Sequence, residues 1–177
     1  MFANFGIDTV IMIVLAAIIG IYLYRLEKKE KSDPLAALCK DCANLSADRL
    51  LKTSDDELVR TIIANILSKT DKRRPDVSQI LPSLSYGQIA VYAVWLVCHE
   101  LESADVDALL RSPSAYFVDM AAEGFALIGA EQCADTLICA VEEPGTEPAL
   151  RDAIATEQPL SLCVAYIRKF PEEFTDL

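Results

Sequence analysis

Residues 85–98, Ser-Tyr-Gly-Gln-Ile-Ala-Val-Tyr-Ala-Val-Trp-Leu-Val-Cys, indicate how this chain folds. Ser85 and Gln88 have the spacing of a capping box, in which each side chain bonds the backbone N–H of the other residue at the start of a helix. The apolar residues after this box recur at helical spacing: Ile89, Tyr92, Ala93, Leu96 and Val97. The stretch therefore predicts a helix with one apolar face that enters a core.

Similar helix signals lie on both sides of this stretch. Ser54 and Glu57 repeat the capping-box spacing ahead of another apolar stripe, and Ser112-Pro113 places Pro at a first helical position, in a helix that Gly129 should end. A further apolar stripe follows, formed by Ala134, Leu137, Ile138 and Val141. Shorter helical stretches cover 146–156 and 161–169. The sequence has no strand-type alternation, so we predict an all-α fold whose neighbouring helices pack antiparallel through short loops.

The N-terminal stretch from Ile7 to Tyr24 is uninterruptedly apolar. As a helix it covers roughly 27 Å, close to the bilayer hydrocarbon thickness of about 30 Å. A cleaved signal peptide is the alternative, but no Lys or Arg precedes the run and bulky residues follow it. The basic residues of this region all come after the run: Arg25, Lys28, Lys29 and Lys31. We therefore expect a single-pass cell-membrane protein with its N-terminus outside and the rest of the chain in the cytoplasm.

These features divide the chain into a membrane anchor with a basic juxtamembrane stretch, 1–31, and an all-α cytoplasmic domain, 32–177. One long irregular connection, from Lys69 to Leu84, interrupts the predicted helices and carries a basic cluster of Lys69, Lys72, Arg73 and Arg74. Such a cluster is either a solvated loop or a contact for lipid headgroups or for an acidic surface of a second copy.

Negative charge is concentrated in the C-terminal half of the chain. The whole sequence carries a net charge of −11, and the segment from Cys98 to Leu177 has sixteen acidic residues against four basic ones, which leaves −12. A field of this sign repels nucleic acid, so we expect no direct nucleic-acid binding and favour a basic protein as partner. The alternative is that the acids only keep the domain soluble.

Six of these acids form the candidate partner-binding set. They lie at helical spacings that place like charges close together: Asp119, Glu123, Glu131, Asp135, Glu142 and Glu143. Like charges four residues apart cost a helix a few tenths of a kcal/mol per pair. A sequence that accepts this cost more than once either presents the charge to a partner or carries a solvated helix face.

The sequence offers little material for catalysis or metal binding. Cys39 and Cys42 form a CxxC pair, but no strand precedes it and no second pair completes a zinc site, unless Cys98 and His99 supply the missing ligands. His99 is the single histidine, and no nucleotide-binding, hydrolase or calcium-loop pattern occurs. We expect no enzyme activity and no cofactor or metal.

Three blocks of the sequence resemble a known family. These blocks are Leu84–Gln88 with Val91–Trp95 and Glu100, Gly124–Ala130 with Ala134 and Ala140, and Leu162–Phe174. Together they resemble the C-terminal domain of the bacterial DNA-mimic protein family, of the DMP-nineteen type, over Leu84 to Phe174. The segment from Glu102 to Val106 stands where that family usually has an Asn-Gly-Gly-Phe element. A membrane anchor is a second departure from the family pattern.

The resemblance implies an all-α, acidic, non-enzymatic domain that is typically dimeric. In the founding type, surface charge imitates the DNA phosphate backbone and occupies a DNA-binding transcription factor. Together with the charge count, this leads us to expect a membrane-anchored acidic module that sequesters a basic or DNA-binding protein. The alternative is a self-associating membrane assembly protein whose acidic surface is only solubilising.

Overall fold

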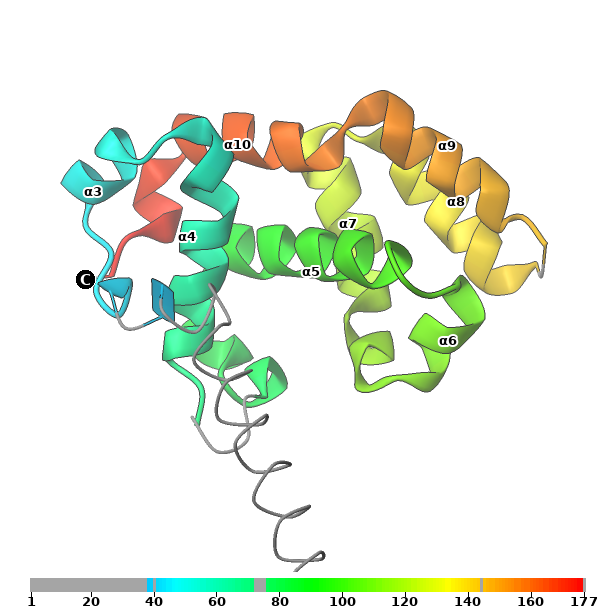
Figure 1. The fold of residues 1–177 in the computed structure, drawn as a ribbon, viewed down its shortest axis with the longest axis horizontal. Helices are drawn as coiled ribbons and strands as arrows, with labels where there is room; N and C mark the ends of the chain where they lie inside the picture. Colours follow the sequence, from blue (N-terminus) through cyan, green and yellow to red (C-terminus); the bar gives the residue numbers. More distant parts are fainter. Residues whose placement is uncertain (1–37, 40, 72–75, 144, 177) are drawn as a thin grey trace, which may run out of the picture.

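The computed structural model describes residues 38–39, 41–71, 76–143 and 145–176 (Figure 1). Over these residues the chain forms helices and no β-strand, which confirms the predicted all-α class. None of the helices in the described ranges is both long enough and apolar enough to cross a bilayer. The predicted span, Ile7–Tyr24, and the basic residues Lys72, Arg73 and Arg74 lie outside the described residues.

The helices and 3-10 turns of the described residues follow one another along the chain. In order they are α3 (Ala47–Lys52), α4 (Asp55–Ser68), η1 (Val77–Gln79), η2 (Leu81–Ser83), α5 (Tyr86–Leu101), α6 (Val106–Arg111), η3 (Pro113–Phe117), α7 (Val118–Ile128), α8 (Glu131–Glu142), α9 (Glu147–Glu157), α10 (Pro159–Lys169) and η4 (Pro171–Phe174).

The helix α5 is central, and its predicted capping box is confirmed. The Gln88 N–H donates to Ser85 Oγ (3.0 Å), and the Ser85 N–H donates to Gln88 Oε1 (3.0 Å). Most α5 side chains are buried, because α4, α6, α7 and α10 all pack against this helix. The contact with α7 is close at Gly124, where an added Cβ would lie 2.9 Å from the Ala90 carbonyl oxygen. Glycine is therefore required for the two helices to approach this closely.

Helices α7, α8 and α9 continue outward from α5. The helix α7 packs against both α5 and α8, and α8 in turn packs against α9 beside it (Figure 1). Gly129 ends α7 in the left-handed region with φ of 86°, as predicted. The buried side of α8 consists of Cys133, Ala134, Leu137 and Ala140.

Three sequence predictions need correction. Ser54 precedes α4 but its side chain makes no capping hydrogen bond, so the capping box is not formed there. Ser112 caps the 3-10 turn η3, where its Oγ accepts from the Ser114 N–H, and the α-helix α7 begins only at Val118. The predicted apolar stripe on α8 is only half buried: Ile138 is 47% exposed and Val141 is 37% exposed. Both lie outside the buried side of α8, so the neighbouring helices leave them uncovered.

The C-terminal end of the chain returns to the first described helices. Asp176 and Leu45 are joined in both directions, by Asp176 N–H to the Leu45 carbonyl (2.9 Å) and by Leu45 N–H to Asp176 Oδ2 (2.7 Å). Asn65 Nδ2 donates to the same carboxylate (2.7 Å), and Lys69 pairs with it (2.6 Å). The region before η1 and the C-terminal helices are therefore connected by this carboxylate.

Candidate functional site

The six acids predicted to bind a partner are all exposed in the structure. Asp119 and Glu123 lie one turn apart on α7. Three others lie on α8, and Glu143 follows its last residue. Within the described ranges, no side chain of these six acids makes a hydrogen bond or an ion pair. Each carboxylate is therefore available to an external group. The α7 pair and the α8 acids lie on two helices that pack together.

The acids of α8 lie in one row along its outer side. Glu131, Asp135, Ile138 and Glu142 follow at spacings of four, three and four residues, which places them in a line along a helix. We call these four residues the α8 outer line. The helix contains no Lys or Arg, so no base on α8 neutralises the line.

Other acids of the C-terminal half have a structural task at helix starts, where backbone N–H groups have no partner within the helix. Glu157 accepts from the N–H groups of Gln132 (3.1 Å) and Cys133 (2.8 Å) at the start of α8. Glu173 accepts from the Gly87 N–H (2.8 Å) at the start of α5. A carboxylate at this position also interacts favourably with the positive end of the helix dipole. These acids are part of the fold and are not free for a partner.

The pKa values of two structural acids follow from these contacts. Burial acts to raise the pKa of Glu157, but hydrogen bonds from the Cys133 side chain and from the backbone of Cys133 and Gln132 hold it below its ordinary value. Burial likewise acts to raise the pKa of Asp176, and bonds from Lys69, Leu45 and Asn65 outweigh it, so this pKa is also lowered. Both groups are therefore carboxylates at neutral pH, as their structural contacts require.

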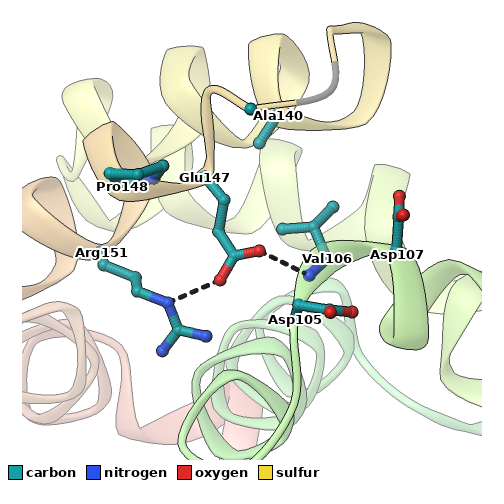
Figure 2. A pocket seen from close by; sticks show the side chains of 8 residues that line it. Asp105, Val106, Asp107, Ala140, Glu147, Pro148 and Arg151 are labelled. Carbon is teal, nitrogen blue, oxygen red and sulfur yellow. Dashed lines mark hydrogen bonds and ion pairs between the residues drawn. The ribbon is translucent and has the colours of Figure 1, made fainter.

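A shallow pocket of about 430 Å³ lies where α6, α8 and α9 meet (Figure 2). Glu147 lies between two partners there: its carboxylate accepts from the Val106 N–H (3.1 Å) and from Arg151 Nε (2.7 Å). The other guanidinium nitrogens of Arg151 donate to the carbonyls of Leu101 (2.5 Å) and Ala104 (2.7 Å). The guanidinium is thus engaged within the protein and does not offer a free cation to a ligand.

Arg151 and Glu147 also hold the segment Glu102–Val106, which stands where the resembled family usually has an Asn-Gly-Gly-Phe element. Arg151 donates to the Ala104 carbonyl, and Glu147 accepts from the Val106 N–H. The segment forms a turn, and Asp105 then caps α6 by accepting from the Ala108 N–H (2.7 Å). Sequence reasoning missed the structural role of Glu147 and Arg151, although their spacing of four residues is that of a helical ion pair. Their contacts to α6 and to the end of α5 had no local signal.

Cys42, Cys98 and His99, which belong to the candidate zinc set, do not lie on the helices that carry the six acids. Burial raises the pKa of the Cys42 thiol, with Arg49 opposing the effect and Asp41 adding to it, and burial raises that of Cys98 to about 12. His99 stacks on Trp95, with ring centroids 5.2 Å apart, and lies 3.5 Å from Glu102. Across the described part of the chain, no three His, Cys, Asp or Glu side chains are arranged to hold a metal ion.

Comparison with known families finds one match. A family model described as DMP19-like protein matches residues 82–177, which are 96 of the 177 residues. The match begins within η2 and includes α5 to α10, and hence all six predicted acids and the capping acids Glu157 and Glu173. No curated protein and no solved structure matches the chain.

Proposed function

The chain belongs to the DMP19-like protein family, and on this premise we propose that it is an acidic protein-binding module that sequesters a basic or DNA-binding protein. One observation carries the proposal. The six predicted carboxylates are exposed and have no partner within the described protein, whereas neighbouring acids such as Glu157 and Glu173 are engaged at helix starts. The fold therefore leaves these negative charges on α7 and at α8 uncompensated.

Carboxylates on packed helices suit the imitation of a phosphate backbone. DNA-binding proteins neutralise phosphates with Lys and Arg, and those contacts position the protein without reading sequence. Asp119 and Glu123 lie on α7, which packs against α5 and α8, so the backbone that carries them is fixed. A fixed backbone lowers the entropy lost on binding, because only the side chains need to become ordered.

Charge also determines how the partner is approached. Opposite charges steer association and make its rate depend on salt, more than they set the final affinity. Neither α7 nor α8 contains Lys or Arg, so these two helices supply no positive charge that would reduce the attraction for a basic partner. We expect fast, salt-sensitive capture.

Attachment to the membrane is a further part of the proposal and depends on the sequence alone. The run from Ile7 to Tyr24 would hold the module at the cytoplasmic face, with the basic residues from Arg25 to Lys31 on the same side. The test is fractionation of cells that express the full chain. Recovery in membranes after an alkaline wash supports the anchor, and release into the soluble fraction contradicts it.

A second candidate function is self-association in a membrane assembly. It is favoured by large apolar side chains that are exposed on several elements, among them Leu51, Tyr86, Tyr116 and Leu160. Apolar self-association tolerates high ionic strength, whereas capture by opposite charge weakens as salt screens it. Salt dependence therefore separates the two functions.

The experiment is a pull-down from host lysate with the full chain at low and high salt. One variant replaces all six acids by their amides: Asp119, Glu123, Glu131, Asp135, Glu142 and Glu143. A control with the same change in charge replaces six other exposed acids whose side chains have no hydrogen bond or ion pair among the described residues: Asp48, Asp56, Glu57, Asp107, Asp152 and Glu172. We expect the full chain to recover a basic DNA-binding protein at low salt. This protein should be lost at high salt and with the six-amide variant, and the control variant should still recover it. Recovery of the chain alone, at either salt, would contradict the proposal.

A further inference from the structure

The α8 outer line contains one apolar residue among its acids. Ile138 lies between Asp135 and Glu142 in the line and is 47% exposed. Beside it, Val141 is 37% exposed and the thiol of Cys139 is exposed. An apolar surface therefore lies within a row of carboxylates.

Packing in the core does not explain why an isoleucine occupies position 138. The inner side of α8 is formed by Cys133, Leu137 and Ala140, which are covered by neighbouring helices. Burying an Ile side chain stabilises a fold, but about half of the Ile138 surface remains in water. Single exposed apolar residues are common on proteins. Ile138 differs from such cases because it has an apolar neighbour and unpaired charges on either side along the helix.

This arrangement matches the general form of a protein interface. Interfaces have an apolar centre that excludes water and a polar rim, and a few central residues contribute most of the binding energy. In the α8 outer line, Ile138 takes the central place and three carboxylates form the rim. A surface that only imitated phosphates would need no apolar centre.

The charge of the rim decides what the surface accepts. A second copy paired through this line about a two-fold axis would place Glu131, Asp135 and Glu142 against the same acids, which repel one another. A nucleic acid is repelled for the same reason. A surface with an apolar side chain among Lys and Arg complements both the centre and the rim.

We propose that the α8 outer line binds an amphipathic basic helix of the partner protein. An apolar side chain of that helix packs on Ile138 and Val141, and its Lys or Arg side chains pair with Glu131, Asp135 and Glu142. Two helices packed side by side present residues at matching spacings of three and four, which suits the row on α8. This inference rests on the proposed function and adds that recognition is partly apolar.

The test uses two synthetic helical peptides of about four turns each. One has a Lys face that surrounds a Leu stripe, and the other has Gln in place of every Leu, so that both carry the same charge. Binding is measured by fluorescence anisotropy to the full chain in nanodiscs of zwitterionic lipid, with empty nanodiscs as the blank. The chain should bind the Leu peptide more tightly than the Gln peptide. Raising the salt should weaken binding of both peptides and leave the ratio of the two affinities unchanged.

The informative variant is Ile138→Ala, and Leu51→Ala is its control. Leu51 is the more exposed residue, and its helix α3 lies at the opposite end of the molecule from α8 (Figure 1). Ile138→Ala should weaken binding of the Leu peptide about tenfold, equivalent to about 1.4 kcal/mol, and leave the Gln peptide unaffected. Leu51→Ala should change neither affinity. Because Ile138 is half exposed, the variant should keep the helical circular dichroism of the parent.

Alkylation of Cys139 locates the bound peptide, since this thiol is exposed beside Ile138. Mass spectrometry should show slower alkylation of Cys139 when the Leu peptide is present. Slower alkylation with rising protein concentration and no peptide would place a second copy on this face and overturn the inference.

The outcomes separate the inference from the proposed function. The triple variant Glu131→Gln, Asp135→Asn and Glu142→Gln could lose binding of both peptides while Ile138→Ala binds them as the parent does. That result would leave acidic capture in place and overturn the apolar centre. Unchanged binding of both peptides by the triple amide variant would overturn the acidic surface as well.

Discussion

Carboxylates lie both at the start of α8 and along its outer line, but only the one at the start has hydrogen-bond partners among the described residues. At the start of the helix, the Glu157 carboxylate accepts two backbone N–H groups and has a lowered pKa. Along the outer line, Glu131, Asp135 and Glu142 are exposed and have no hydrogen bond or ion pair with any residue that the structure describes. The comparison teaches that net charge alone does not identify a binding surface. What distinguishes the two sets is whether the fold supplies a partner for the carboxylate.

Asp176→Ala should have the largest effect on stability among the acids. The variant removes the acceptor of the Leu45 N–H and one of the two acceptors of the buried Asn65 amide, which keeps its bond to the Cys42 carbonyl. It also removes the ion pair with Lys69. Unsatisfied buried donors cost about 1–3 kcal/mol, so we expect the free energy of unfolding to fall by about 2–3 kcal/mol. Urea denaturation at neutral pH measures this change.

Asp135→Ala is the matched control on the outer line. The same substitution there removes an exposed carboxylate that has no partner among the described residues, so the free energy of unfolding should stay within about 0.5 kcal/mol of the parent. Equal losses for the two variants would remove the distinction between structural and free carboxylates.

Glu157→Ala should have the next largest effect. The change removes the acceptor for two N–H groups at the start of α8, and losing such a cap costs about 1 kcal/mol. Thermal denaturation should show the loss, and hydrogen exchange should be faster at Gln132 and Cys133. If those two amides kept their protection, the Glu157 cap would not exist in solution.

Acid should weaken the protein through Asp176 and Glu157. Because their pKa values in the folded state lie below the ordinary values of 3.8 and 4.5, both carboxylates stabilise the fold above those values. The contribution is lost as pH falls through the lowered pKa values. Between about pH 6 and about pH 3, Asp176→Asn with Glu157→Gln should therefore lose less stability than the parent. Parallel pH profiles of the two proteins would contradict this assignment.

The smallest expected effect has the opposite sign. Glu131→Gln with Asp135→Asn removes a repulsion between like charges four residues apart, which costs about 0.2–0.5 kcal/mol per pair. Glu131 also lies in the first turn of α8, where its charge is favourable, so the net gain should be a few tenths of a kcal/mol. A loss above about 1 kcal/mol in urea denaturation would mean that these acids have a structural partner.

Local signals explain what the sequence could predict. The capping box of α5 involves residues three apart, and Gly129 ends α7 through its own backbone, so both were readable without tertiary information. The exposure of the six acids also followed from helical spacing. The all-α class needed nothing beyond this periodicity.

The missed features depend on distant contacts. Glu157 reaches N–H groups 24 and 25 residues away, and Glu173 reaches one that is 86 residues away. The exposure of Ile138 was missed because helical periodicity locates an apolar stripe but does not show how far neighbouring helices cover it. Ser54 has the capping-box spacing without the bond, so spacing alone was insufficient there.

The most direct test compares the two sets of carboxylates in one binding experiment. Three proteins are titrated with the Leu peptide: the full chain, the triple variant Glu131→Gln, Asp135→Asn and Glu142→Gln, and the control Glu157→Gln. Urea denaturation is measured on the same samples. We predict that the triple variant loses binding and keeps its stability, while Glu157→Gln loses stability and keeps binding. Equal binding by all three proteins would contradict the assignment of the outer line as the binding surface.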